Sequence, residues 1–151
     1  MKVLMLNGSC NPKGCTYTAL TEVGKTLTSA GIDYEIVQLD GGPVRDCIGC
    51  NQCSKNGCVF TDGGVNDFIA KARQADGFVF GTPVYYAHPS GRVLSFLDRV
   101  FYAGGSAFVG KPGAAVASAR RAGTTASLDA LGGEYHTPEG TSVWLADVEL
   151  E

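Results

Sequence analysis

The sequence has no long hydrophobic run. Hydrophobic residues make up 44% of the 151 positions, but no stretch approaches the roughly 20 consecutive apolar residues that a membrane-spanning helix needs. The apolar start at Met1 stops at Asn7, which is too short for the core of a secretory signal. We therefore expect a cytoplasmic protein with no membrane partner.

Charge is also scarce. Charged residues make up 18% of the chain, and 12 basic against 15 acidic residues give a net charge of −3. Nucleic-acid-binding domains usually carry a basic surface, so we expect no nucleic-acid partner. The sequence contains two histidines, His88 and His136, and neither the G-x-S-x-G nor the H-E-x-x-H motif. These absences argue against a serine hydrolase and a zinc protease.

Apolar runs alternate with helical patterns along the chain, which is typical of an α/β fold with a parallel sheet. The expected strands cover residues 3–6, 34–39, 77–80 and 113–117, and the expected helices cover 20–31, 65–72 and 93–101. The second strand is only half apolar, which suits the edge of the sheet, whereas the third is fully apolar and suits its centre. Ligands of such sheets bind beyond the carboxyl ends of the strands.

The loop that follows the first strand, NGSCNPKGCTYT, is rich in glycine and hydroxyl side chains and leads into a helix. Backbone N–H groups at a helix N-terminus form a ready anion site. The loop matches neither the Walker pattern nor the dinucleotide fingerprint G-x-G-x-x-G. The sequence therefore predicts either a phosphate site or an ordinary strand-to-helix turn.

Three motifs, NGSCNPKGCTYT, GTPVYYAHPSG and SARRAGTT, together resemble the NADPH-dependent FMN reductase family over about residues 1–131. The four cysteines after the second strand look like those of the iron–sulfur flavoproteins within it. The resemblance implies a single flavodoxin-like domain over residues 1–151. Its doubly wound parallel sheet would have the strand order 2-1-3-4-5.

The resemblance also implies an FMN site made by three loops. Residues around the FMN phosphate would be Ser9, Lys13, Gly14 and Thr16. Residues along the ribityl chain and isoalloxazine ring would be Pro83, Val84, Tyr85 and Tyr86. Residues that close over the polar edge of the ring would be Ser118, Arg120, Arg121, Gly123 and Thr124. Either arginine could instead hold the 2′-phosphate of NADPH as a bidentate clamp.

A protein of this family would be an NAD(P)H oxidoreductase that passes electrons through FMN to a small acceptor such as a quinone or a flavin. The alternative is an iron–sulfur flavoprotein that carries electrons between protein partners. In both cases the flavin carries the chemistry, and we expect no catalytic side chain that acts as an obligatory acid or base. The family also implies a homodimer or a homotetramer.

The cysteine loop has the spacing C-x2-C-x2-C-x4-C, formed by Cys47, Cys50, Cys53 and Cys58. Four thiolates on a short loop suit a [4Fe–4S] cluster or tetrahedral zinc. Structural zinc sites usually separate two cysteine pairs by a longer span, so zinc is the weaker alternative. Free thiols without a metal remain the third. Cys10 and Cys15 lie outside this loop and are read as incidental.

The C-terminal segment 132–151 does not resemble the family's continuation. Residues 141–150 could form a fifth strand, but no helix follows to cover it. Parallel sheets need both faces covered, so the fifth strand and the last helix are the doubtful parts of the predicted fold.

Overall fold

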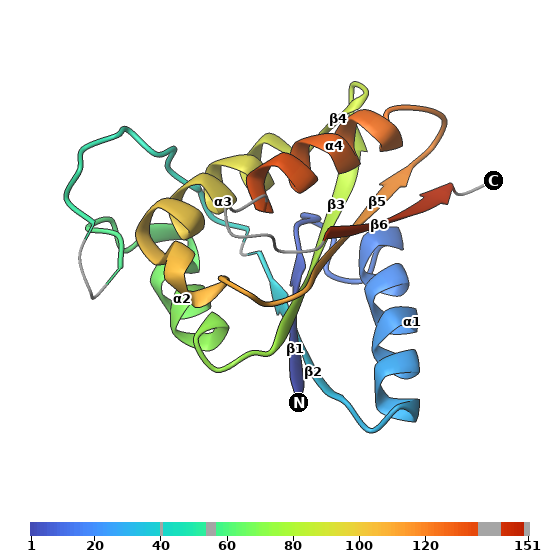
Figure 1. The fold of residues 1–151 in the computed structure, drawn as a ribbon. Helices are drawn as coiled ribbons and strands as arrows, with labels where there is room; N and C mark the ends of the chain where they lie inside the picture. The colour runs from blue at the N-terminus through green and yellow to red at the C-terminus, as the bar shows by residue number, and fades with distance from the viewer. Residues whose placement is uncertain (40, 54–56, 136–142, 150–151) are drawn as a thin grey trace.

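The computed structural model describes residues 1–39, 41–53, 57–135 and 143–149, the last of these as backbone. The parallel strands lie in the order β2 (Asp33–Gln38), β1 (Lys2–Asn7), β3 (Gly77–Tyr85), β5 (Gly113–Ala119) and β6 (Val143–Glu149). This is the predicted order 2-1-3-4-5, with β5 and β6 as its fourth and fifth members. The flavodoxin-like, doubly wound fold is confirmed (Figure 1).

The half-apolar strand β2 lies at the edge of the sheet and the apolar strand β3 at its centre, as predicted. However, β3 continues to Tyr85, where the sequence indicated a loop after residue 80. It then turns into β4 (His88–Pro89), which pairs antiparallel with its end. The two residues of the turn, Tyr86 and Ala87, have φ of 51° and 60°, as a two-residue hairpin turn requires.

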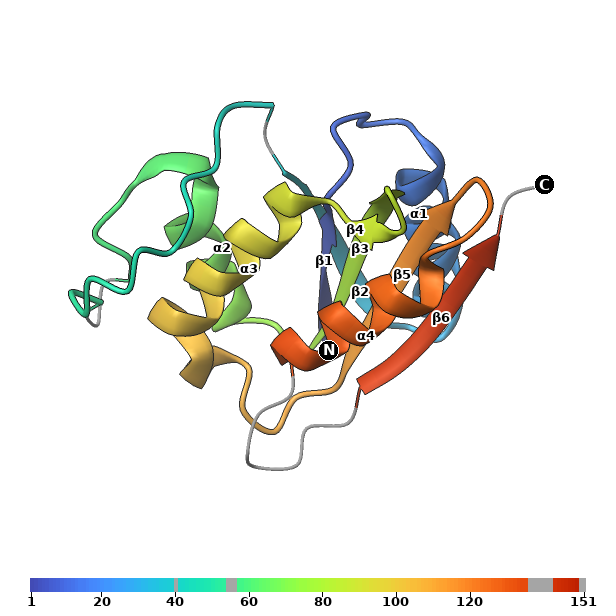
Figure 2. The same cartoon turned by 90° about the horizontal axis from the view of Figure 1, so that it is seen from above.

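Four helices cover the described sheet. Helix α1 (Cys15–Ser29) lies on one face, whereas α2 (Val65–Ala72), α3 (Gly91–Gly104) and α4 (Thr124–Tyr135) lie on the other (Figures 1 and 2). Short 3-10 turns at Asp62–Gly64 and Gly105–Ala107 precede α2 and follow α3. None of the helices in the described ranges is long and apolar enough to cross a membrane.

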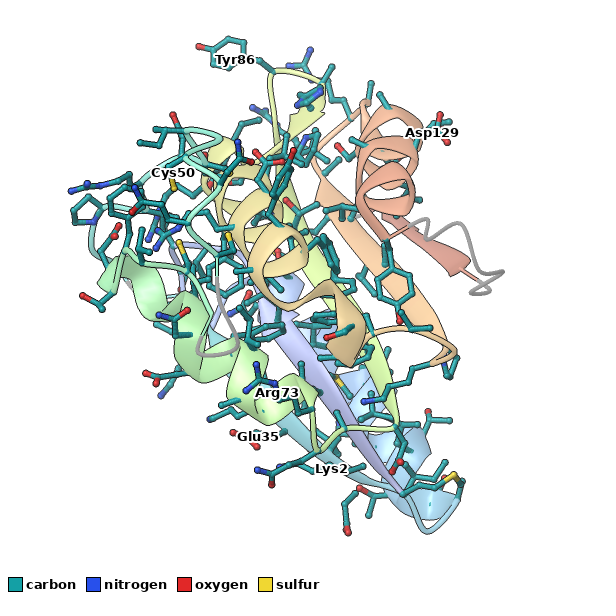
Figure 3. All side chains as sticks on the ribbon, turned by 60° about the vertical axis from the view of Figure 1, so that its left-hand side comes forward. Lys2, Glu35, Cys50, Arg73, Tyr86 and Asp129 are labelled. Atoms are coloured by element: carbon teal, nitrogen blue, oxygen red, sulfur yellow. The ribbon has the colours of Figure 1, made fainter. Side chains whose placement is uncertain are left out.

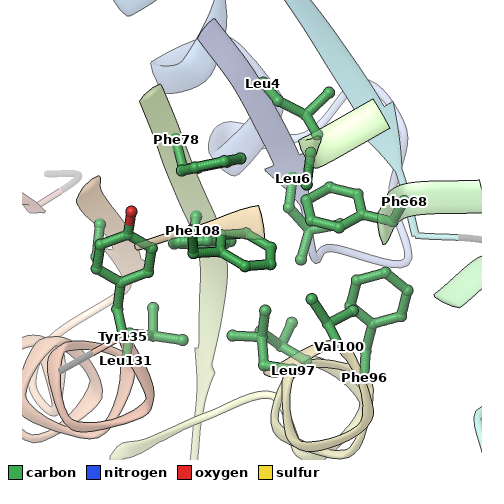
Figure 4. Close-up of a cluster of buried hydrophobic side chains, with 14 of the residues drawn as sticks. Leu4, Leu6, Phe68, Phe78, Phe96, Leu97, Val100, Phe108, Leu131 and Tyr135 are labelled. Carbon is green, nitrogen blue, oxygen red and sulfur yellow. The ribbon is translucent and has the colours of Figure 1, made fainter. Parts of the chain in front are cut away.

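The larger core lies between the sheet and the face that carries three helices. Phe78 of β3 contacts Phe108 with ring centroids 4.5 Å apart, and Tyr135 of α4 packs against both (Figure 4). The Tyr135 hydroxyl donates to the backbone oxygen of Lys111 at 2.8 Å, so the one polar atom of this buried ring is satisfied.

Helix α4 was not predicted, and it covers one face of the sheet at its end. It precedes β6 and packs against both β5 and β6. Its large buried side chains are only Leu128, Leu131 and Tyr135, so the helical pattern in its sequence is weak. Residues 136–142 of the atypical segment lie outside the described residues, as does His136.

Candidate functional site

Three loops meet at the carboxyl edge of the sheet. The strand register places Asn7 beside Gly81 and Pro83 beside Ser118. The first loop begins against β3, since the Gly8 N–H donates to the Gly81 backbone oxygen at 2.8 Å. The pairing of β1, β3 and β5 therefore brings together the three motifs that carried the resemblance.

Side chains of the first loop hold its backbone in place. The Ser9 N–H donates to Asn7 Oδ1 at 3.2 Å, and the Asn11 N–H donates to Ser9 Oγ at 3.1 Å. From the neighbouring strand, Gln38 Nε2 donates to the Ser9 backbone oxygen at 2.6 Å. A loop ordered in this way before any ligand arrives loses less conformational entropy on binding.

The loop ends at the N-terminus of α1, which has Gly14 as its N-cap residue and no side-chain cap. The first turn, CTYT, contains no acidic residue. Backbone N–H groups that no carboxylate competes for, at the positive end of a helix dipole, favour an anion. The hydroxyl of Thr16 lies in this turn, buried, 2.8 Å from that of Ser118. The arrangement suits a phosphate group.

A cavity lies between these loops. It is lined by Ser9, Asn11, Gly14, Cys15, Thr16, Pro83, Ser118, Ala119 and Arg120. Six of the thirteen predicted flavin-site residues are therefore brought together: Ser9, Gly14, Thr16, Pro83, Ser118 and Arg120. Sequence reasoning missed Asn11, Cys15 and Ala119. Asn11 could have been found, because a short polar side chain inside a phosphate-type loop is itself a signal.

The other predicted residues lie around the cavity and are not among those lining it. Lys13 and Arg121 are exposed, whereas Thr124 is buried at the start of α4. Gly123 has φ +97°, and a Cβ there would lie 2.3 Å from Ala87 Cα. The loop after β5 is thus packed directly against the hairpin turn.

The hairpin carries the three remaining predicted residues. Val84 is half-buried, whereas Tyr86 is fully exposed at the tip, at the end of the molecule opposite Lys2 and Glu35 (Figure 3). The Tyr85 hydroxyl lies 3.6 Å from the Cys10 sulfur. This contact and partial burial raise the pKa of Tyr85. Cys10, read as incidental, therefore links the first loop to the hairpin.

A second cavity lies beside α3 and is lined by the predicted metal ligands. All four cysteines, Cys47, Cys50, Cys53 and Cys58, contribute to it, together with Ile48, Gly49, Asn51, Phe60, Arg99 and Tyr102. Desolvation raises the pKa of Cys53, and the charges of Cys58, Cys50 and Cys47 raise it further. The four sulfurs thus share one electrostatic environment, in which a cation would favour their ionised form.

The last cysteine is fixed by a residue of α2. Asn66 accepts from the Cys58 N–H at 2.8 Å and donates to the Cys58 backbone oxygen at 2.8 Å. Gly57 makes this approach possible, since a Cβ there would lie 2.4 Å from Asn66 Oδ1, and its φ is +103°. Cys58 thereby lines the same cavity as the other three cysteines.

A [4Fe–4S] cluster and a single zinc ion make different demands on the four cysteines. Zinc requires thiolates at about 2.3 Å from one point, and the described residues contain no group of three or more His, Cys, Asp or Glu placed to hold one metal ion. In a [4Fe–4S] cluster each thiolate binds a different iron, so the four sulfurs need only surround a common space. Four cysteines that line one cavity meet that looser requirement.

Comparisons with known proteins agree with this fold. The profile of the NADPH-dependent FMN reductase family matches residues 1–136. An iron–sulfur flavoprotein of Methanocaldococcus jannaschii is 34% identical over 100 residues, covering 66% of this chain and 51% of the relative. One of Archaeoglobus fulgidus is 32% identical over 99 residues, covering 66% and 48%. The chain therefore spans about half the length of the curated relatives it matches.

Solved structures show the same fold at low sequence identity. The NAD(P)H:quinone oxidoreductase of Methanothermobacter marburgensis superposes with a TM-score of 0.72 at 16% identity, over 99% of this chain and 86% of that one. A flavone reductase superposes with a TM-score of 0.72 at 19% identity, over 99% and 53%.

Proposed function

Since this chain belongs to the NADPH-dependent FMN reductase family, we propose that it binds FMN and acts as an NAD(P)H oxidoreductase. Electrons from NAD(P)H would pass through FMN to a small acceptor such as a quinone or a free flavin. The observation that carries this proposal is the cavity where the uncapped N-terminus of α1 meets the hydroxyls of Ser9, Thr16 and Ser118. It combines an anion site with the carboxyl edge of the sheet, where such folds bind their ligands.

The roles of the side chains follow from their positions. The phosphate would be held by Ser9, Gly14 and Thr16 with Lys13 as the nearby cation, the ring by Pro83, Val84, Tyr85 and Tyr86, and its polar edge by Ser118, Arg120, Gly123 and Thr124. Both arginines are exposed, but Arg120 lines the cavity and Arg121 does not. We therefore assign Arg120 to the flavin and Arg121 to the phosphate of the pyridine nucleotide.

Bound FMN accepts a hydride and releases electrons singly or in pairs, and the protein binds and orients it. Our assignment gives no side chain the role of an obligatory acid or base. The buried hydroxyls would fix the phosphate, and the hairpin would set the face on which a nucleotide or an acceptor can approach. We also expect the protein to be cytoplasmic and to form a homodimer or homotetramer. Light scattering on the purified protein measures the oligomeric state.

The test is FMN binding followed by turnover. Purified protein should quench FMN fluorescence on titration, and NADPH or NADH should bleach the bound flavin. Sustained oxidation of NAD(P)H with a quinone would support the reductase. Binding and bleaching without turnover would favour the electron carrier, and failure to bind FMN at all would contradict both.

A second candidate, an iron–sulfur flavoprotein that carries electrons between protein partners, is favoured by the cysteine cavity. Cys47, Cys50, Cys53 and Cys58 line it together, and the curated relatives carry that name. Anaerobic purification with assays of iron and sulfide tests this candidate. About four irons per chain would support a [4Fe–4S] cluster, whereas one zinc or no metal would contradict it.

A further inference from the structure

Arg99 is the one buried charged residue of the described chain that no predicted site includes. Its side chain is 1% exposed, within the helix α3. A buried charge persists only where hydrogen bonds and a counter-ion offset its desolvation. The ion pair with Asp62, at 3.2 Å, supplies a counter-ion that is itself about one-third exposed.

The guanidinium of Arg99 binds both ends of the cysteine loop. Its NH1 donates to the Arg45 backbone oxygen at 3.2 Å, two residues before the first cysteine. Its NH2 donates to the Phe60 backbone oxygen at 2.7 Å, two residues after the last. A planar group with five N–H donors in a fixed fork can hold two segments of backbone in a defined geometry, which the ammonium group of lysine lacks. Arg99 therefore closes the loop at its base.

One donor of Arg99 is left over. Its Nε is buried and has no hydrogen-bond partner among the residues that the structure describes. Leaving a buried donor unpaired is unfavourable, so a buried N–H of this kind is expected to have an acceptor outside the protein chain. The same side chain lines the cavity of the four cysteines, where thiolate or sulfide sulfur would be the acceptor.

One side of helix α3 contacts the cysteine loop and the residues that precede it. Arg92 donates to the Gly42 backbone oxygen at 2.8 Å, and Ser95 donates to Asp46 Oδ1 at 2.5 Å. With Arg99 and the cavity-lining Tyr102 they follow the spacing i, i+3, i+7 and i+10, which places them on one side of the helix. The neighbouring side, with Val93, Phe96, Leu97 and Val100, is buried in the core.

We infer that Arg99 positions the cysteine loop and donates its Nε–H to the anionic iron–sulfur group that the four cysteines hold. The second half of this inference rests on the proposed [4Fe–4S] cluster, whereas the first half concerns the protein alone. A buried cation that donates to the sulfurs of a cluster stabilises its reduced, more negative form. Charge and hydrogen bonds of this kind set cluster potentials, so Arg99 should raise the potential of this one.

The experiment compares Arg99→Gln with Arg45→Gln after anaerobic reconstitution with iron and sulfide. Arg45 is the matched control: its exposed guanidinium lies 4.5 Å from the Phe60 ring, so the substitution removes one charge from the same loop. Its backbone oxygen, which Arg99 uses, remains. We expect Arg99→Gln to retain iron against a chelator roughly 10-fold less well, with a more negative cluster potential, and Arg45→Gln to stay near wild type.

Equal iron retention and equal potentials in the two variants would overturn the donor role. Circular dichroism and FMN titration show whether Arg99→Gln folds. If it does not, Arg99→Lys replaces it, because it keeps the charge without the planar fork. A negative shift or a loss of iron in Arg99→Lys is then the expected result, and wild-type values in it would overturn the inference.

Hydrogen exchange on the apoprotein separates the two halves of the inference. The Arg45 N–H donates to Asp62 Oδ2 at 3.0 Å, and this contact lies at the base of the loop. We expect its exchange to speed up in the Arg99 variant and not in Arg45→Gln. If wild-type protein takes up no iron, the proposed cluster fails, yet faster exchange would still support the positioning role. Unchanged exchange would overturn it.

Discussion

The side-chain oxygens of Thr16 and Ser118 lie 2.8 Å apart, and this contact joins the start of α1 to the end of β5. Both side chains are buried and both line the cavity at the edge of the sheet. Two hydroxyls that share one hydrogen bond keep a second hydrogen for another acceptor. The pair therefore both fixes two loops and offers a donor to a phosphate oxygen.

Thr16→Val should weaken FMN binding by about 10-fold. Valine keeps the shape of the side chain but removes the hydroxyl, and a hydrogen bond to a charged group contributes roughly 1.5–3 kcal/mol. Part of that loss is recovered by backbone N–H groups of the same helix end, so the lower figure applies. Titration of FMN with the protein, followed by flavin fluorescence, measures the dissociation constant.

Thr18→Val is the matched control for this variant. Thr18 is exposed on the same helix and does not line the cavity, and its hydroxyl donates to the backbone oxygen of the N-cap residue Gly14 at 3.2 Å. We expect its FMN affinity to stay near that of wild type. Equal affinities in the two valine variants would show that the Thr16 hydroxyl does not contact the phosphate.

The sequence was enough to predict the sheet because its strands differ in composition for a physical reason. Residues 77–80 of β3 are apolar since both faces of this central strand are covered, and β2 is half polar since it lies at the edge. Those differences predicted which strand lies at the edge and which at the centre, whereas the full strand order was implied by the resemblance to the FMN reductase family. Helix α4 escaped prediction because its inward residues Leu128, Leu131 and Tyr135 stand among small and polar ones.

Some of the functional residues could also be predicted from the sequence, and others could not. Ser9, Thr16 and Ser118 could be predicted because they belong to loops with a recognisable local pattern. The role of Arg99 could not, since it depends on contacts with residues 37 to 54 positions away along the chain. The signal that existed was an arginine next to Val100, beside the apolar side of a predicted helix.

Gly123→Ala should destabilise the protein. The residue has φ +97°, which costs a side chain roughly 1–3 kcal/mol, and its Cβ would lie 2.3 Å from Ala87 Cα. Backbone of the hairpin would have to move away from the loop after β5. We expect a lower free energy of unfolding in urea, together with weaker FMN binding, because the displaced loop carries Arg120.

Gly133→Ala provides the contrast for the same substitution. Gly133 lies in α4, and a Cβ there meets nothing within 4 Å. Alanine is favoured over glycine inside a helix by roughly 0.5–1 kcal/mol, so this variant should be as stable as wild type or more so. If both alanine variants changed stability alike, the close packing of Gly123 on the hairpin would be wrong.

Tyr86→Gly should leave stability intact and weaken FMN binding. Tyr86 has φ 51° and a fully exposed side chain, so glycine relieves backbone strain and removes no buried area. A tyrosine held in this way at a loop tip suggests a role in binding. Thermal unfolding measures stability, and FMN titration measures binding. Tyr102 is also exposed, but Tyr102→Gly is not a suitable control because it would put a glycine inside helix α3.

Tyr86→Asn is the matched variant, because asparagine also tolerates a positive φ but lacks the aromatic ring. It should bind FMN as weakly as Tyr86→Gly does. Wild-type affinity in both would remove Tyr86 from the flavin site, and a large loss of stability in either would show that the ring packs on the protein itself.

Glu35→Gln should make the protein less sensitive to acid. Hydrogen bonds from the ammonium groups of Lys2 and Lys71 hold the pKa of Glu35 below its ordinary value. A lowered carboxyl pKa stabilises the fold above the ordinary value of 4.5, and this stabilisation is lost as the pH falls through the lowered value. The pairs are partly exposed, so the contribution is about 1 kcal/mol or less.

The difference in unfolding free energy between wild type and Glu35→Gln, measured in urea from pH 7 to pH 3, should therefore shrink at acid pH. Glu22→Gln, which removes one exposed pair with Lys25, should show a smaller difference at pH 7. A Glu35→Gln difference that stays constant with pH would show that the two lysines do not hold this carboxylate.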